Sequence, residues 1–568
     1  MAKKADTQNY EIDWIQRDRK VIDGLDHLGI ELVSVNLYQE MLPGLTNVTE
    51  RARYYALYPW IIHRYAQDGA KARTKAAWRN WIRSIDFTYA VACMAYEQKI
   101  GKDLGSSVVG ADLAGKVVKA AKPTQKIDLH SPSQVSETGA VPKSGVYFQN
   151  PEGGFGQYYR GALRILGAAH EHGESTWPNV QLSNYAGKKI AESLDHNKAF
   201  SKLEDFALAG KASLAELSVI GESIHPSRID RDSEEVSILR KLFLGQDPDL
   251  CQGQRAEELK WRRDSLLLML HYLREAKSID GRPDIEFRWA CATKALPNGK
   301  PWKIPKLLGN AAQVWGTYQR NDLLNYCLEC IFYAALKEVD RGPLRPNDLL
   351  KTLTDQAMAA VPANSDYQAL PALPAKVLKW IAATASPDST SSADPWGPRS
   401  TWTLTQRLES AVSDDELTAI PALVARILGR LVSDRGGAVG HPFALLPNAV
   451  EMAASHEVHL RQWWNRAHSR SSEGTSEFLG ELFLEWVIYR HLRVATRKLA
   501  NQGVSTYKFR PEEGHLLLVA ERIPEPTFTS PRVRQGFRIA EDLHFIDRNS
   551  SVRQLSDLGK AALEAHHA

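Results

Sequence analysis

Large aromatic side chains recur at helical spacing in the stretch from residue 49 to residue 85. The side chains at steps of three and four residues are Tyr54, Tyr58, Ile61 and Tyr65. Side chains at this spacing share one face of a helix, so the sequence predicts a mainly α fold. Pro59 lacks a backbone N–H, and we expect it to divide the stretch into two helices. Asn47 and Glu50 have the spacing of a capping box, which predicts a helix start at this point.

The same stretch is rich in cations, several of them four residues apart. The candidate nucleic-acid-binding residues are Arg51, Arg53, Arg64, Lys71, Arg73, Lys75, Arg79 and Arg83. Such side chains neutralise phosphates, and Tyr55, Trp60 or Trp78 could stack on bases or pack beneath the cations. The alternative is that the aromatic residues form the core and the cations a solvated face with acidic neighbours.

In the last seventy residues the helical pattern gives way to a mixture of strand-like and helical patterns. Residues 504–510 alternate in polarity and are followed by a Pro-Glu-Glu-Gly turn and an apolar run, which predicts a β-hairpin. Helical patterns follow over residues 531–543 and 555–565. This order is typical of a winged-helix-like α+β module, in which the first helix could enter a nucleic-acid groove. Its candidate nucleic-acid-binding residues are Arg532, Arg534 and Arg538.

A chain of 568 residues is too long for one hydrophobic core, so we expect several domains. The predicted N-terminal helical domain covers residues 1–120, and a polar segment at 121–145 is typical of a linker. A central helical domain is expected over 146–384, with long helices near 256–276 and 311–338. A Ser- and Pro-rich linker follows at 385–400. A helical domain at 401–503 and the winged-helix-like module at 504–568 complete the prediction.

Overall charge and cysteine content restrict the possible partners and compartment. The formal net charge is only +4, so any contact with nucleic acid must come from local clusters of cations. Five scattered cysteines argue against a disulfide framework and for a reducing compartment. No run approaches the roughly twenty apolar residues that cross a bilayer, and we expect a cytoplasmic protein without a membrane partner.

The sequence contains no complete catalytic motif, and no cofactor or metal is expected. The glycine-rich Gly153–Gly156 stretch lacks the Gly-Lys-Ser/Thr of a P-loop, so it is interpreted as a tight turn. His456 and His459 lack the four-residue spacing of a zinc-protease pair. Cys327 and Cys330 lie in a helical pattern without a second cysteine pair, which favours packing in a core. The sequence leaves open whether the protein is an enzyme and favours a protein that is not.

Three blocks of sequence resemble an uncharacterised family of large bacterial proteins found in anti-phage defence islands. They are residues 42–60, LPGLTNVTERARYYALYPW; 315–332, WGTYQRNDLLNYCLECIF; and 489–514, YRHLRVATRKLANQGVSTYKFRPEEG. The resemblance implies a subunit of a multi-protein defence system. We therefore expect a DNA-binding, scaffolding or sensor subunit whose partners are nucleic acid, with DNA favoured, and other defence proteins. The alternatives are a metal-dependent nuclease or nucleotide hydrolase with a site built from distant residues, and a pure protein-interaction hub.

Overall fold

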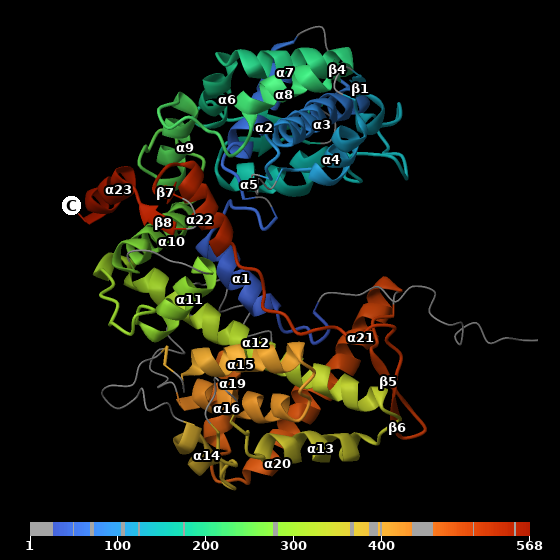
Figure 1. Cartoon of the computed structure of the whole chain (residues 1–568), viewed down its shortest axis with the longest axis vertical. Helices are drawn as coiled ribbons and strands as arrows, with labels where there is room; N and C mark the ends of the chain where they lie inside the picture. Colours follow the sequence, from blue (N-terminus) through green and yellow to red (C-terminus); the bar gives the residue numbers. More distant parts are fainter. Residues whose placement is uncertain are drawn as a thin grey trace, which may run out of the picture. The chain divides into compact units, whose positions relative to one another are not determined.

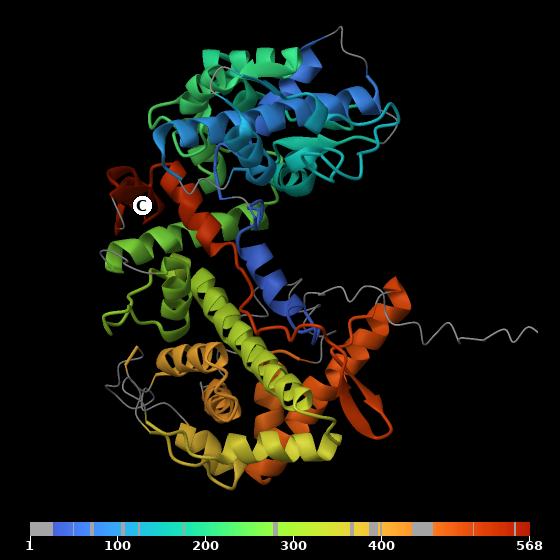
Figure 2. The same cartoon turned by 45° about the vertical axis from the view of Figure 1, so that its right-hand side comes forward.

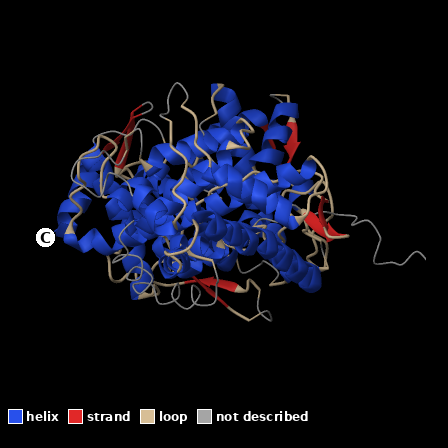
Figure 3. Ribbon diagram, turned by 90° about the horizontal axis from the view of Figure 1, so that it is seen from below, coloured by secondary structure: helices blue, strands red, loops and turns tan. Residues whose placement is uncertain are grey.

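The protein is mainly α-helical, as predicted, with only short two-stranded sheets (Figure 3). The structure is a computed structural model. It describes residues 26–48, 50–68, 73–103, 108–122, 125–173, 177–276, 282–363, 369–384, 396–397, 400–433, 458–503, 505–549 and 552–567. Among these residues, no helix is both long enough and apolar enough to cross a membrane.

The chain forms two compact units, each assembled from separate parts of the sequence. Unit 1 contains residues 1–37, 297–301 and 316–529, and unit 2 contains residues 38–296, 302–315 and 530–568. The chain passes from one unit to the other inside helix α1 (Leu32–Met41) and inside helix α12 (Gly309–Asp340). The sequence predicted contiguous domains instead, because local pattern does not reveal which distant segments pack together.

Unit 2 contains the N-terminal basic and aromatic stretch. Its helices are α2 (Tyr54–Gln67), α3 (Lys75–Ile100), α4 (Ala111–Ala120), α5 (Arg160–Ile165), α6 (Gly187–Asp195), α7 (Lys198–Ala209), α8 (Leu214–Ile224), α9 (Glu234–Leu244), α10 (Ala256–Ala276), α11 (Pro283–Thr293), α22 (Val533–Asp542) and α23 (Asp557–His567). Helix α3 packs against α8 and also against α4 (Figures 1 and 2). Short antiparallel strand pairs join β1 (Lys126–Asp128) to β4 (Lys211–Ser213), and β2 (Ala169–Glu171) to β3 (Val180–Leu182).

Helix α2 is buried almost throughout, which explains two errors of the sequence analysis. The helix continues through Pro59, because packing on all sides compensates for the missing backbone donor. The predicted capping box is also wrong. Helix α2 begins at Tyr54, and Asn47 instead accepts a hydrogen bond from the side chain of Arg532, while Glu50 pairs with Arg534.

The aromatic face of α2 packs in the core of unit 2. The ring of Tyr58 lies 5.0 Å from that of Tyr159 and 5.6 Å from that of Phe155. The ring of Tyr54 lies 5.3 Å from Tyr159 and 5.5 Å from Tyr89. Aromatic pairs at these centroid distances contribute roughly 0.5–1.5 kcal/mol each beyond the burial of their surface. The periodic aromatic pattern in the sequence is therefore a packing pattern.

Residues 125–145 are part of unit 2 and do not form the predicted linker. Strand β1 pairs with β4, and the backbone carbonyl oxygen of Gly139 accepts a hydrogen bond from Arg79 on α3. Ser133 is fully buried beside α3. Polar composition suggested a connector here, but the backbone polar groups of this segment bond to side chains of the helical core.

The glycine-rich Gly153–Gly156 stretch forms a tight turn that enters a π-helical turn, Phe155–Tyr159. The backbone N–H of Gly154 donates to Asp86 Oδ2 at 2.9 Å, which holds the turn against α3. A Cβ at position 154 would clash with Val109 and would lie 2.7 Å from Tyr58 Oη. Close approach of the backbone therefore requires glycine here.

Replacing Gly154 with alanine should destabilise the protein by ~1–3 kcal/mol, because the added methyl group overpacks this contact. Gly161→Ala in α5 is a matched control, since a Cβ there meets nothing within 4 Å. Alanine is the better helix former, so this control should be neutral or slightly stabilising. Urea unfolding of the two variants measures both effects, and equal stability of the two would contradict the close contact.

Unit 1 contains a second group of packed helices and one β-hairpin. Its elements after α12 are α13 (Pro346–Met358), α14 (Val377–Thr384), α15 (Thr401–Ser413), α16 (Ala419–Ser433), α19 (Leu460–Ser469), α20 (Thr475–Phe483), the π-helical turn Leu484–Ile488, α21 (Tyr489–Gln502), β5 (Phe509–Glu512) and β6 (His515–Leu518). Cys327 and Cys330 are fully buried free thiols in α12, which confirms their predicted packing role. The predicted linker at 385–400 lies mostly outside the described residues.

The C-terminal segment contains the predicted elements but divides between the two units. The β5–β6 hairpin belongs to unit 1, whereas α22, α23 and a second hairpin, β7 (Ile546–Asn549) with β8 (Val552–Leu555), belong to unit 2. The sequence analysis placed the first hairpin and both helices and missed the second hairpin. Strand propensity is local, whereas membership of a compact unit depends on long-range packing.

Candidate anion-binding pocket

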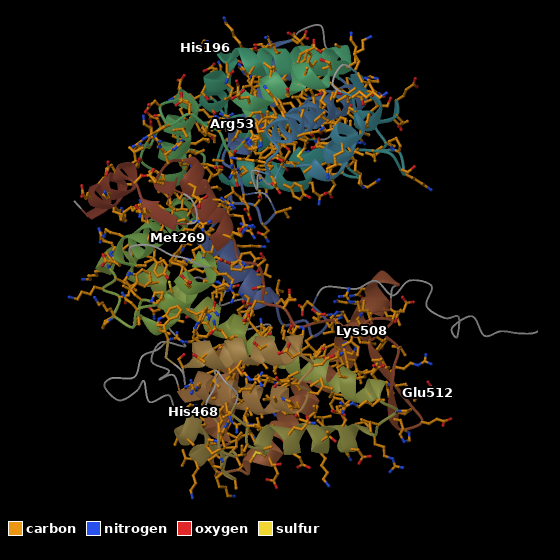
Figure 4. The ribbon with its side chains drawn as sticks, viewed as in Figure 1. Arg53, His196, Met269, His468, Lys508 and Glu512 are labelled. Atoms are coloured by element: carbon orange, nitrogen blue, oxygen red, sulfur yellow. The ribbon has the colours of Figure 1, made fainter. Side chains whose placement is uncertain are left out.

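Two of the predicted cations precede α2 and are buried inside unit 2. Arg53 forms a two-pronged ion pair with Glu235 of α9, with Nη2 2.9 Å and Nε 3.1 Å from the carboxylate oxygens (Figure 4 labels Arg53). Arg51 lies 3.4 Å from Asp542 of α22, and both side chains are at least 94% buried. The expectation that Arg51 and Arg53 lie on an open surface is wrong, because each neutralises a buried carboxylate.

Arg83 on α3 is also buried and is bound by carbonyl groups. Its guanidinium donates to the backbone oxygens of Ser133, Phe148 and Asn150 at 2.7–3.0 Å. Burial lowers the pKa of Arg83, and the nearby Asp86 carboxylate opposes this shift. Arg83 therefore ties the 133–150 segment to α3 and is not an exposed phosphate ligand.

The cations of α22 likewise bond within unit 2. Arg532 donates to Asn47 Oδ1 and to the carbonyl oxygen of Leu42. Arg538 pairs with Glu541 at 2.8 Å, and its Nε lies 3.6 Å from Glu50. Arg534 pairs with Glu50 at 2.7 Å, although its own side chain is 66% exposed. Helix α22 is thus joined to the segment that precedes α2, and the expected open recognition-helix surface is absent for Arg532 and Arg538.

The remaining N-terminal cations differ in their surroundings. Arg64 pairs with Glu204 of α7 at 2.8 Å. Arg73 donates to the carbonyl oxygen of Tyr65 and lies over the ring of the same residue. Lys71 lies outside the described residues. Lys75 and Arg79, one helical turn apart at the start of α3, have no ion pair with a carboxylate in the part of the chain that the structure describes.

Lys75 and Arg79 line a polar pocket of about 460 Å³ in unit 2. The other lining residues are Asn150, Pro151, Glu152, Arg160, Glu171, Trp177 and Asn179. The Lys75 ammonium lies 5.9 Å from the centre of the Trp177 ring, and the Arg79 guanidinium lies 5.7 Å from it. Pockets of this size that combine an aromatic side chain with convergent polar groups are typical binding sites.

Arg160 forms ion pairs with both carboxylates of the pocket, Glu152 and Glu171. Its guanidinium lies 2.6 Å from Glu152 and 3.2 Å from Glu171. Burial by itself would lower the pKa of Arg160. The charge of Glu152 and its hydrogen bond to Arg160 outweigh burial, so the pKa is raised. Glu152 also accepts a hydrogen bond from the indole N–H of Trp78 at 2.9 Å. Neither Lys75 nor Arg79 has a carboxylate within ion-pair distance among the described residues, although the charge of Glu152 partly offsets the lowering of the Arg79 pKa by burial.

Two buried polar atoms in the pocket walls have no hydrogen-bond partner among the described residues. They are Nε of Arg79, a donor, and Oδ1 of Asn179, an acceptor. Burial without a partner costs about 1–3 kcal/mol for each such group. Similar atoms occur elsewhere among the described residues, such as Nε of Arg51 and of Arg466, so the two atoms do not by themselves distinguish this pocket.

The aromatic residues proposed for base stacking lie elsewhere. Tyr55, Trp60 and Trp78 are all at most 1% exposed, so they belong to the core. Trp177 is the half-buried aromatic residue that lines the pocket, and the sequence analysis missed it. In the sequence, Trp177 is distinguished only by its place in an otherwise polar segment without helical period, HEHGESTWPN.

Asp86 on α3 is a fully buried carboxyl group. Burial raises its pKa to about 7, although the N–H of Gly154 and the hydroxyl of Tyr58 donate to it. The folded protein therefore holds a proton on Asp86 that the unfolded chain releases from about pH 4 upward. Because the folded state binds more protons between about pH 4 and 7, the contribution of Asp86 to stability falls as the pH rises through this range.

We expect the stability difference between the natural protein and Asp86→Asn to shrink as the pH rises from 5 to 7.5. Asparagine does not titrate, so the comparison isolates Asp86 from other groups such as the buried His225. Urea unfolding at the two pH values provides the measurement. A difference that is constant with pH would show that Asp86 does not change protonation in this range.

Comparison with protein-family models, curated proteins and solved structures finds no match to this chain. In the described part of the chain, no group of three or more His, Cys, Asp or Glu side chains is placed to hold a metal ion. His456, one of the two histidines that the sequence analysis compared with a zinc-protease pair, lies outside the described residues.

Proposed function

We propose that the protein is a nucleic-acid-binding subunit of a bacterial anti-phage defence complex and that it contacts the nucleic acid through the pocket at the start of α3. The single observation that supports the binding proposal is the pair of cations Lys75 and Arg79, which have no carboxylate within ion-pair distance among the described residues and lie next to a half-buried Trp177. Cations that neutralise phosphates and an aromatic face on which a base stacks are the two elements of single-strand binding.

The defence context of the proposal comes from the resemblance of three sequence blocks. A scaffolding or sensor role alongside other defence proteins stays a prediction, as does the cytoplasmic location. A winged-helix-like module at residues 504–568 is not needed for the proposal, since its segments fall into different compact units. DNA is the favoured nucleic acid, and the arrangement of the pocket is compatible with a single strand.

Charge reversal at the pocket should weaken binding in a salt-dependent manner. We expect Lys75→Glu and Arg79→Glu each to lower affinity for a labelled single-stranded oligonucleotide and to reduce the slope of log affinity against log salt by about 1. Lys99→Glu is a matched control, because Lys99 is an exposed cation at the other end of the same helix. Fluorescence anisotropy at several salt concentrations gives both quantities.

The outcome that would overturn the proposal is specific. If the natural protein binds single-stranded oligonucleotides with the same affinity and the same salt slope as both pocket variants, the contact lies elsewhere. If no oligonucleotide binds at low salt, the chain does not bind nucleic acid by itself. Circular dichroism of each variant would check that the helical fold is retained, a check that Arg79→Glu needs most because Arg79 also donates to the carbonyl oxygen of Gly139.

A further inference from the structure

The pocket that Lys75 and Arg79 line has features that a simple backbone contact does not require. A site that follows a phosphate backbone is an extended groove, with cations spaced along it. Here the two cations and the aromatic ring line one pocket of about 460 Å³. A concave site of this size accommodates one small group rather than a length of duplex.

The charges in the pocket favour an anionic group, because three of the lining side chains are cations (Lys75, Arg79 and Arg160) and two are carboxylates (Glu152 and Glu171). Arg160 is occupied by Glu152 and Glu171, whereas Lys75 and Arg79 remain without carboxylate partners among the described residues. An internal phosphodiester carries one negative charge, and a phosphate monoester carries about −1.5 to −2 at pH 7. A terminal phosphate also has three acceptor oxygens, so Lys75 and Arg79 can both donate to it.

The rest of the wall matches a nucleoside. Trp177 offers an aromatic face for a base, and base stacking on an aromatic side chain is tolerant of sequence. The carboxylate of Glu171 is 42% exposed and can accept a hydrogen bond from a sugar hydroxyl.

We propose that this pocket binds one nucleotide that carries a terminal phosphate, with the phosphate between Lys75 and Arg79 and the base against Trp177. The inference rests on the proposed nucleic-acid-binding function and names the part of the nucleic acid that enters the pocket. A phosphorylated strand end and a free nucleoside monophosphate share this chemistry, and the experiment below separates them.

The test measures binding of the full chain to internally labelled 12-residue single strands that differ only in their ends. One carries a 5′-phosphate, one a 3′-phosphate and one hydroxyl groups at both ends, and adenosine monophosphate and inorganic phosphate serve as competitors. We expect at least one phosphorylated strand to bind about tenfold more tightly than the hydroxyl-ended strand. Adenosine monophosphate should compete better than inorganic phosphate, because only the nucleotide reaches Trp177.

Variants of Trp177 test the base contact. We expect Trp177→Leu to weaken binding of the phosphorylated strand by about 5- to 150-fold, the range that stacking of one base on an aromatic side chain supplies. Trp177→Phe keeps an aromatic face and should retain most of the affinity. Equal losses in Trp177→Leu and Trp177→Phe would show that the ring does not stack on a base.

The outcomes separate this inference from the function on which it rests. If all three strands bind equally and Arg79→Glu weakens each of them, the protein binds nucleic acid through its backbone, and the terminal-nucleotide inference is wrong. If adenosine monophosphate binds but no strand does, the pocket takes a free nucleotide, and the nucleic-acid-binding function is wrong. If neither binds, both proposals fail.

Discussion

Replacing Arg53 with alanine should lower the free energy of unfolding by about 3–5 kcal/mol, because it leaves a buried carboxylate without its partner. Both side chains of the Arg53–Glu235 pair are only 4% exposed. Arg53 Nη1 also donates to the carbonyl oxygen of Ser223 at 2.8 Å. Removal of the guanidinium therefore leaves the buried Glu235 carboxylate without its partner and removes the donor to the Ser223 carbonyl.

The matched control for Arg53→Ala is Lys188→Ala on α6. Lys188 pairs with Glu192 four residues away, but both side chains are about half exposed. Exposed pairs of this kind contribute roughly 0.2–1 kcal/mol. Chemical denaturation should therefore separate the two variants clearly. If Arg53→Ala unfolded at the same denaturant concentration as Lys188→Ala, the burial of the Arg53–Glu235 pair would be contradicted.

Replacing Trp78 with alanine should destabilise the protein by about 3–5 kcal/mol, the usual cost of removing a large buried aromatic side chain. Trp78 is fully buried, its ring packs 5.2 Å from that of Tyr65, and its indole N–H donates to Glu152. The substitution leaves a cavity and removes one donor from a buried carboxylate. Thermal unfolding followed by circular dichroism measures the loss.

Trp177→Ala is the comparison that distinguishes a core tryptophan from a ligand-binding one. Trp177 is half-buried and makes its cation–π contacts at the long distances of 5.7 and 5.9 Å, so its removal should cost far less stability than that of Trp78. We expect the opposite order for nucleic-acid affinity measured under conditions where both variants are folded. A larger loss of stability in Trp177→Ala than in Trp78→Ala would reverse the assignment of the two residues.

Individual helices could be predicted where the pattern was long and periodic. The helix expected near residues 256–276 is α10 with the same bounds, and the one expected at 311–338 lies within α12. Errors arose where a local signal competed with packing. Pro59 lies inside α2, and the apparent capping box at Asn47 is occupied by contacts with α22, because burial outweighs local propensity.

The candidate site could be predicted only in part. Lys75 and Arg79 were among the cations singled out from the sequence, but so were Arg51, Arg53 and Arg83, which are buried. Nothing in the local sequence distinguishes these two groups, since all five lie in the same basic stretch. Trp177 could not be associated with Lys75 and Arg79, because about a hundred residues of chain separate them.

The sequence by itself determined the helical class of the protein and the packing of Cys327 and Cys330, because periodicity and hydrophobicity act between neighbours along the chain. It left open whether the aromatic residues form the core or a binding surface. Only the tertiary structure decided which cations remain available to a ligand. Arg53 meets Glu235, 182 positions away, while Lys75 and Arg79 meet no carboxylate partner among the described residues. Charge compensation depends on distances of a few ångströms in space, and the fold alone brings those groups together.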